Sequence, residues 1–168
     1  MEFVMNNKSV HISLSECLTE LRDLETLIDK DVFDSRNRFL ILYAIIRATG
    51  VLEVSYKKII VDSFDSINNE KINNYLEMEI SKSSKNPSYS NLISTLKKFD
   101  DDWCKKFKKE IGNMRNKDSI LEAMENLNEL RNSFAHGGKP TPSIRSVNLY
   151  FENCIEILKI YDKVIHEG

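Results

Sequence analysis

The sequence predicts an all-α fold, an up-and-down helical bundle of about five or six helices. Apolar residues recur at intervals of three and four along most of the chain, which is the spacing of one face of an α-helix. Glycine and proline are scarce, with five and three among 168 residues, so the tight turns of β-hairpins are poorly supplied. A hydrophobic content of 41% can support the core of one domain.

We therefore expect a single helical domain over residues 1–168, with residues 1–12 forming a flexible N-terminal tail. Ser13 or Ser15 is a candidate N-cap for the first helix, whose apolar spacing continues to Ile28. No basic region followed by an apolar segment opens the chain, so we expect no signal peptide and a cytoplasmic protein.

The second helix should run from about Arg36 to Phe64 and be the central buried one, because its first half is apolar nearly all round. Its longest apolar run is only eight residues, far short of a membrane span. Gly50 inside it predicts either the close approach of another helix or a bend. Glu53 and Lys57 are four residues apart, the spacing of an ion pair on a helix surface.

Residues 68–79 predict a third, more polar helix. The polar segment 81–88 reads as a loop whose composition favours mobility. Ser90 is a candidate cap for the next helix, and the acidic triplet Asp100–Asp102 suits the N-terminus of the one after it.

A cluster of basic residues follows that triplet, interleaved with Trp103 and Phe107. The net charge of −2 excludes a protein that coats nucleic acid through a global basic field, so any RNA contact must be local. This cluster is either such a local patch or a solvated helix face whose aromatic residues belong to the core, and nearby acidic residues favour the second interpretation. Its members are Lys105, Lys106, Lys108, Lys109, Arg115 and Lys117.

Two further helices are expected after Asp118 or Ser119 and after Thr141-Pro142, the latter pair read as N-cap and first helical residue. The last helix carries an unbroken apolar stripe that suits packing either against the central helix or along a dimer seam. The stripe consists of Ile144, Val147, Phe151, Cys154, Leu158, Tyr161 and Ile165.

The first of these two helices ends in the one segment of the sequence whose residue types suggest a functional site. Arg131 falls within its apolar arc, where an unpaired guanidinium would cost several kcal/mol, so it needs a carboxylate, an aromatic face, a second chain or a phosphate. His136 would project about 140° away on an ideal helix. Gly137-Gly138 and Pro140 should end the helix near His136, and unwinding of the last turn would let the imidazole swing toward the arginine.

No other site stands out. The three cysteines are widely spaced and form no zinc motif, and an odd number fits reduced thiols better than disulfides. They are Cys17, Cys104 and Cys154. His11 and His166 lie near the ends of the chain and suit neither a ligand nor a base. The sequence holds no H-E-x-x-H, P-loop or G-x-G-x-x-G, so we expect no metal and no cofactor.

The pattern Arg131-x4-His136, with Asn132 directly after the arginine and Gly137 after the histidine, resembles the HEPN superfamily, particularly two of its branches, the RiboL-PSP-like branch among them. The resemblance implies an all-α domain that forms homodimers and brings two motifs together. It also implies a metal-independent endoribonuclease of toxin–antitoxin or abortive-infection systems. One branch carries a tyrosine two residues after the histidine; Gly138 stands here, which argues against regulation by modification of such a tyrosine.

This resemblance assigns catalysis to Arg131 and His136, with Asn132 in support. Related domains often place a polar or acidic residue opposite the motif, and Glu53 would be that residue, orienting Arg131 or His136. The implied partners are RNA, a second copy and an antitoxin or larger defence protein. Weak RNA contacts are expected from Lys105, Lys106, Lys109 and Lys139. The alternatives are a non-catalytic helical module that binds a partner protein, and a purely structural arginine and histidine at a helix end.

Overall fold

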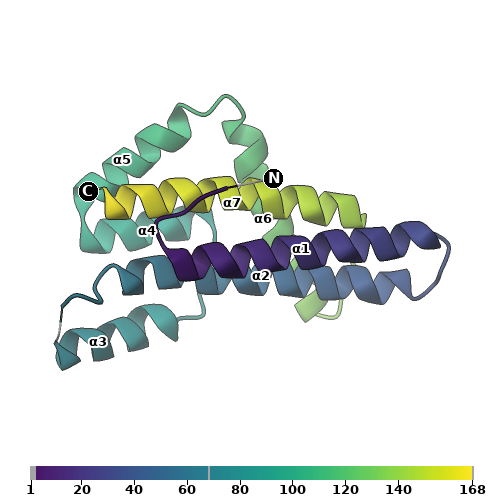
Figure 1. Cartoon of the computed structure of the whole chain (residues 1–168), viewed down its shortest axis with the longest axis horizontal. Coiled ribbons are helices and arrows are strands. Elements are labelled where there is room, and N and C mark those ends of the chain that lie inside the picture. Colours follow the sequence, from purple (N-terminus) through teal and green to yellow (C-terminus); the bar gives the residue numbers. More distant parts are fainter. Residues whose placement is uncertain (1–2, 68, 168) are drawn as a thin grey trace.

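The computed structural model describes residues 3–67 and 69–167, and every regular element within them is helical. The predicted all-α fold is confirmed, with seven α-helices in the described residues where five or six were expected (Figure 1). In chain order the elements are α1 (Lys8–Lys30), α2 (Asn37–Asp62), α3 (Glu70–Leu76) with the π-helical turn η1 (Glu77–Ser81) continuing it, α4 (Tyr89–Phe99), α5 (Asp101–Gly112), α6 (Lys117–Ala135) and α7 (Ile144–His166).

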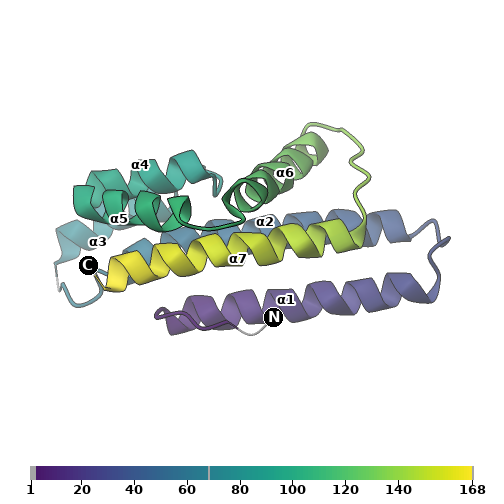
Figure 2. The same ribbon diagram turned by 90° about the horizontal axis from the view of Figure 1, so that it is seen from above.

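Helices α2 and α7 form the centre of the bundle. Figure 2 shows them side by side, with α1 along one face and α4, α5 and α6 on the other. The apolar stripe predicted for the last helix is buried along its whole length, and its side chains face α1, α2, α5 and α6 rather than solvent. Phe151 and Tyr161 are among the largest fully buried side chains, and the Tyr161 ring meets Phe107 edge-on with 5.6 Å between ring centroids.

The N-terminal segment corrects our expectation of a flexible tail over residues 1–12. Residues 1 and 2 lie outside the described part of the chain, but Phe3 and Met5 are buried and α1 already begins at Lys8. The backbone N–H groups of Asn6 and Asn7 donate to the carboxylate of Asp162 on α7. Burial raises the pKa of this carboxyl group. Asp162 is a polar residue inside an apolar stripe, and the sequence pattern gave no sign that it holds the N-terminus.

Helix starts follow the expected chemistry, although not always at the expected residue. The side chain of Asn7 caps α1 by accepting a hydrogen bond from the Val10 N–H, whereas Ser13 and Ser15 lie inside the helix. Ser143 caps α7 in place of Thr141. Asn69, Ser88 and Asp100 cap α3, α4 and α5 in the same way.

One side of α2 stays outside the core. Phe39, Tyr43, Ile46 and Val54 are exposed along it, and a Cβ built on Gly50 between them would meet no atom within 4 Å. The helix whose close approach Gly50 predicted is therefore absent from the described part of this chain. Helix α2 is long and apolar enough to cross a membrane, as the core helices of soluble proteins also can be. Here it packs against α1, α6 and α7.

Candidate functional site

Helix α6 changes character along its length. Its first half contributes Ile120, Ala123, Met124 and Leu127 to the core, whereas no residue from 128 to 135 is buried. The last turns therefore extend beyond the packed part of the bundle, and in Figure 1 they emerge below α2. This exposed end carries the Arg131–His136 motif.

The end of α6 is defined by backbone hydrogen bonds around two glycines. The helix ends at Ala135, as predicted, with His136 as the C-cap residue. The Gly137 N–H donates to Phe134 O at 3.0 Å, and the Gly138 N–H donates to Ser133 O at 2.8 Å, the two bonds of a Schellman motif. Gly137 has a φ of +82°, and a Cβ on Gly138 would lie 2.4 Å from Ser133 Oγ. Both glycines are thus needed to stop the helix directly after His136.

His136 remains on the helical path and does not turn toward Arg131. Its N–H still donates to Asn132 O at 3.0 Å, so the last turn is not unwound as we expected. The two side chains leave α6 about 140° apart, the angle of an ideal helix. Within the described residues no hydrogen bond joins them. His136 is exposed and Arg131 half-buried, so a single chain presents the two groups in different directions.

Arg131 makes little use of its donors. Its Nη1 donates to Asn132 Oδ1 at 3.1 Å, and among the described residues no carboxylate forms an ion pair with it. A guanidinium has five N–H donors in a planar fork that matches a phosphate, so most of them remain available to a ligand. The partner that the sequence required for this arginine is thus only partly supplied by the chain itself.

The loop over residues 82–88 lies against α6. We expected little burial in this segment, and that expectation is wrong. The mobility that we inferred from it stays a prediction. Pro87 is buried, and side chains from α2, α4 and α6 donate to the loop backbone. These bonds run from Tyr56 to Lys85 O at 2.9 Å, from Lys57 to Ser83 O, from Asn91 to Asn86 O at 2.9 Å and from Asn128 to Pro87 O at 2.9 Å.

Glu53 forms the predicted ion pair with Lys57, at 2.6 Å between Oε1 and Nζ. The lysine end of this pair is buried, because only 8% of the Lys57 side chain is exposed, whereas 27% of the Glu53 side chain is exposed. In the part of the chain described here, Glu53 makes no hydrogen bond to Arg131 or His136. The structure therefore supports the ion-pair interpretation of Glu53, and a direct orienting role stays a prediction.

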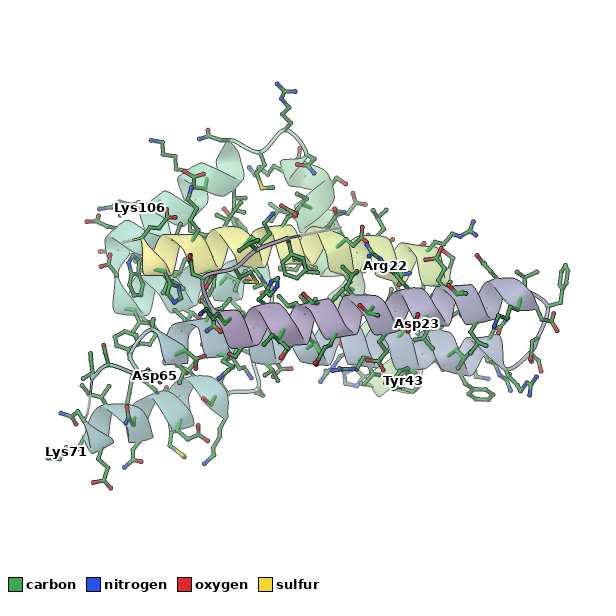
Figure 3. All side chains as sticks on the ribbon, in the orientation of Figure 1. Arg22, Asp23, Tyr43, Asp65, Lys71 and Lys106 are labelled. Atoms are coloured by element: carbon green, nitrogen blue, oxygen red, sulfur yellow. The ribbon has the colours of Figure 1, made fainter. Side chains whose placement is uncertain are left out.

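The structure does not bring the lysines of α5 to the motif. Phe107 is buried and Trp103 packs against the core, while Lys105, Lys106 and Lys109 are exposed and Lys105 pairs with Asp102 at 2.8 Å. Figure 3 shows Lys106 at the upper left, above α7, whereas in Figure 1 the end of α6 emerges below α2. This arrangement agrees with a solvated helix face.

Lys139 is the one lysine of the expected set close to the motif. It is exposed three residues after His136, in the segment that leads to α7. Beside this segment a groove runs between α6 and α7, with Leu130, Pro142 and Tyr150 among its lining residues. The sequence gave no signal for the groove, because it depends on how α7 returns along α6.

The fold and the site together define a class, an all-α bundle that presents an arginine and a histidine five residues apart at an exposed helix end. The family model described as RiboL-PSP-HEPN matches residues 12–167, and the chain belongs to this HEPN family. Comparisons with curated proteins and with solved structures gave no match.

Proposed function

We propose that this chain is a metal-independent endoribonuclease of the HEPN type that serves in the cytoplasm as a toxin or defence effector. The observation that carries the proposal is the exposed end of α6, where the fold leaves a guanidinium and an imidazole accessible to a ligand. Membership of the HEPN family supports this use of the motif.

The chemistry uses the 2′-OH of the RNA as the nucleophile. This oxygen attacks the adjacent phosphorus, the bond from phosphorus to the 5′-oxygen breaks, and the products are a 2′,3′-cyclic phosphate and a 5′-OH. Arg131 holds the phosphate and offsets the charge that develops on its oxygens. His136 takes the 2′-OH proton or donates one to the leaving oxygen, because imidazole exchanges protons near neutral pH. Asn132 positions Arg131 through its side-chain oxygen.

A homodimer would complete this site. One motif supplies a single imidazole, whereas in-line cleavage profits from both a base and an acid. Arg131 and His136 of one chain also point about 140° apart, so a phosphate bound by Arg131 would meet the partner's His136 more readily. The exposed apolar face of α2, with Phe39, Tyr43, Ile46 and Val54, supports pairing with a second copy.

The test of the activity uses purified protein and a single-stranded RNA in EDTA. We expect cleavage to 2′,3′-cyclic phosphate or 3′-phosphate ends, no cleavage of the matching DNA, and no cleavage at a site with a single 2′-deoxy substitution. His136→Ala should lose about 10²-fold or more, the scale of one proton-transferring group. Full activity of that variant, or cleavage that requires Mg²⁺, would contradict the proposal.

The test of the shared site mixes two inactive variants. If Arg131 of one chain works with the partner's His136, a heterodimer of Arg131→Ala and His136→Ala chains contains one intact site, and mixing should restore activity. If both groups of a site come from one chain, mixing restores nothing. Light scattering at micromolar concentration should give the mass of a dimer; a strictly monomeric mass would argue against this arrangement.

The second candidate is a non-catalytic module that binds a partner protein, such as an antitoxin or a larger defence protein. The observation in its favour is the same exposed face of α2, which carries Phe39, Tyr43, Ile46 and Val54. Expression in growing cells separates the two functions. Toxicity that His136→Ala relieves favours the nuclease, and an unchanged phenotype favours the binding module.

A further inference from the structure

Lys57 is a buried lysine that is hydrogen-bonded to the loop beside α6, and neither core packing nor the proposed reaction explains why a lysine stands there. A buried ammonium group is destabilising by several kcal/mol unless it is paired and hydrogen-bonded, and an apolar side chain of similar size would serve packing as well. Its Nζ has two partners, Glu53 Oε1 at 2.6 Å and the carbonyl oxygen of Ser83. The second partner belongs to the loop that lies against α6.

The segment 83–87 is held by side chains from three helices. From α2, Lys57 donates to Ser83 O and Tyr56 donates to Lys85 O at 2.9 Å. From α6, Asn128 donates to Pro87 O at 2.9 Å. From α4, Asn91 donates to Asn86 O at 2.9 Å. Four carbonyl groups of five successive residues thus accept hydrogen bonds from helix side chains, and the segment bridges α2 and α6.

Asn86 lies within this bridge and reaches the motif. Its Nδ2 donates to Asn132 Oδ1 at 3.5 Å, and Arg131 Nη1 donates to the same oxygen at 3.1 Å. Because two donors converge on one oxygen, the orientation of the Asn132 amide depends on where Asn86 lies. The orientation of the Arg131 guanidinium depends in turn on that amide.

We propose that Lys57 is a positioning residue that orients Arg131 through the segment 83–87, Asn86 and Asn132. The inference deepens the proposed function and rests on it, because the guanidinium must be aimed at a phosphate for its orientation to matter to catalysis. An arginine side chain has many rotamers, and a group held in place before the substrate binds needs no reorganisation during the reaction. Displacement of such a group by about 1 Å can lower a rate by about 10²-fold.

The first experiment compares Lys57→Met with Lys58→Met. Lys58 is the adjacent lysine on the same helix, but it is exposed and pairs with Asp62 at 3.1 Å, so it controls for the loss of a lysine from α2. We expect Lys57→Met to lower kcat by about tenfold to a hundredfold with a much smaller change in KM, and Lys58→Met to retain both values. Equal kcat in the two variants, with Lys57→Met folded, would overturn the inference.

A second measurement does not depend on RNA cleavage. The NMR signal of the Arg131 Nε–H group is assigned by its disappearance in Arg131→Ala. We expect this signal to shift in Lys57→Met and to keep its wild-type position in Lys58→Met. A protein that cleaves no RNA but shows this shift refutes the proposed function while supporting the positioning. An unshifted signal in folded Lys57→Met refutes the positioning alone.

Two more variants keep the test decisive. Asn128→Ala removes the hydrogen bond from α6 to Pro87 O and leaves the Glu53–Lys57 pair intact. It should shift the Arg131 signal and lower kcat, even if Lys57→Met fails to fold. Wild-type behaviour of Asn128→Ala would count against the role of the segment 83–87. Glu53→Gln retains an oxygen that accepts from Lys57, so it should lose less activity than Lys57→Met. An equal or larger loss would show that the Glu53 carboxylate itself acts on the reaction, and it would overturn the role of Lys57.

Discussion

The last two turns of α6 and the whole of α7 use similar helices for opposite purposes. Twelve residues of α7 are buried, whereas residues 128–135 of α6 contribute none to the core. Side chains of α7 are therefore constrained by their neighbours, while Arg131 and His136 are constrained mainly by the backbone that carries them. The difference teaches that this bundle separates stability from chemistry along the chain, so that substitutions in the two regions should change different observables.

The largest effect on stability is expected in α7. Phe151→Ala removes a fully buried ring and should lower the free energy of unfolding by about 3–5 kcal/mol, measured by urea denaturation. Leu149→Ala on the same helix is the matched control, because Leu149 is 56% exposed. Its effect should stay within about 0.5 kcal/mol. Similar losses in both variants would mean that the packing of α7 has been misread.

At the end of α6 we expect the reverse pattern. Arg131→Ala should lower kcat/KM for RNA by about 10²-fold or more, which corresponds to about 2.7 kcal/mol of transition-state stabilisation. Its free energy of unfolding should change by less than about 0.5 kcal/mol. Arg131→Lys should recover little activity, since an ammonium cannot make the forked contact. A large loss of stability in either variant would remove the distinction between the two regions.

Gly138 tests whether the backbone alone places His136. Gly138→Ala brings a Cβ within 2.4 Å of Ser133 Oγ and 2.7 Å of Ser133 O, so the terminal hydrogen bond must break or shift. We expect a loss of about 1 kcal/mol in stability, together with a clear fall in activity. Gly112→Ala, at the end of α5, is the control: its Cβ meets nothing within 4 Å, and it should lower neither stability nor activity. Thermal denaturation and the RNA assay, run in parallel, measure both effects.

The smallest effect concerns the carboxyl group inside α7. Burial raises the pKa of Asp162 above its ordinary value of 3.8, so the folded protein binds this proton more tightly than the unfolded chain. Its contribution to stability is therefore greatest at low pH and falls as the pH rises through the folded pKa. Asp162→Asn removes this dependence, and the stability of the variant relative to the wild type should increase between pH 3 and 7. The opposite slope in urea titrations would show that the N–H groups of Asn6 and Asn7 dominate.

Much of this division could be predicted from the sequence, because it follows from local rules. The buried stripe of α7 follows from apolar spacing, and the end of α6 follows from the two glycines and the following prolines. The exposure of the motif was less predictable: Arg131 lies on the apolar arc of α6, but the core ends one turn earlier, at Leu127. Periodicity identifies a face of a helix and does not show where its neighbours end.

The remaining features depend on contacts between distant segments. The spacing of Glu53 and Lys57 predicts a pair but not its burial, which arises because the segment 83–87 covers it. Likewise, Phe3 is in the core because Asp162 accepts hydrogen bonds from the backbone three and four residues later. We expected the N-terminal segment to be flexible and the segment 81–88 to be mobile. Neither expectation took account of side chains from distant helices that bond to the backbones of these segments.

Trp103 on α5 has a practical consequence for spectroscopy. It is the only tryptophan of the chain, it packs against the core, and Figure 1 shows α5 above α7 while the end of α6 emerges below α2. Its fluorescence should therefore report unfolding of the bundle while remaining indifferent to a ligand at the motif. A second reporter attached near His136 would give an independent colour channel, so that one titration can distinguish occupancy of the site from melting of the protein.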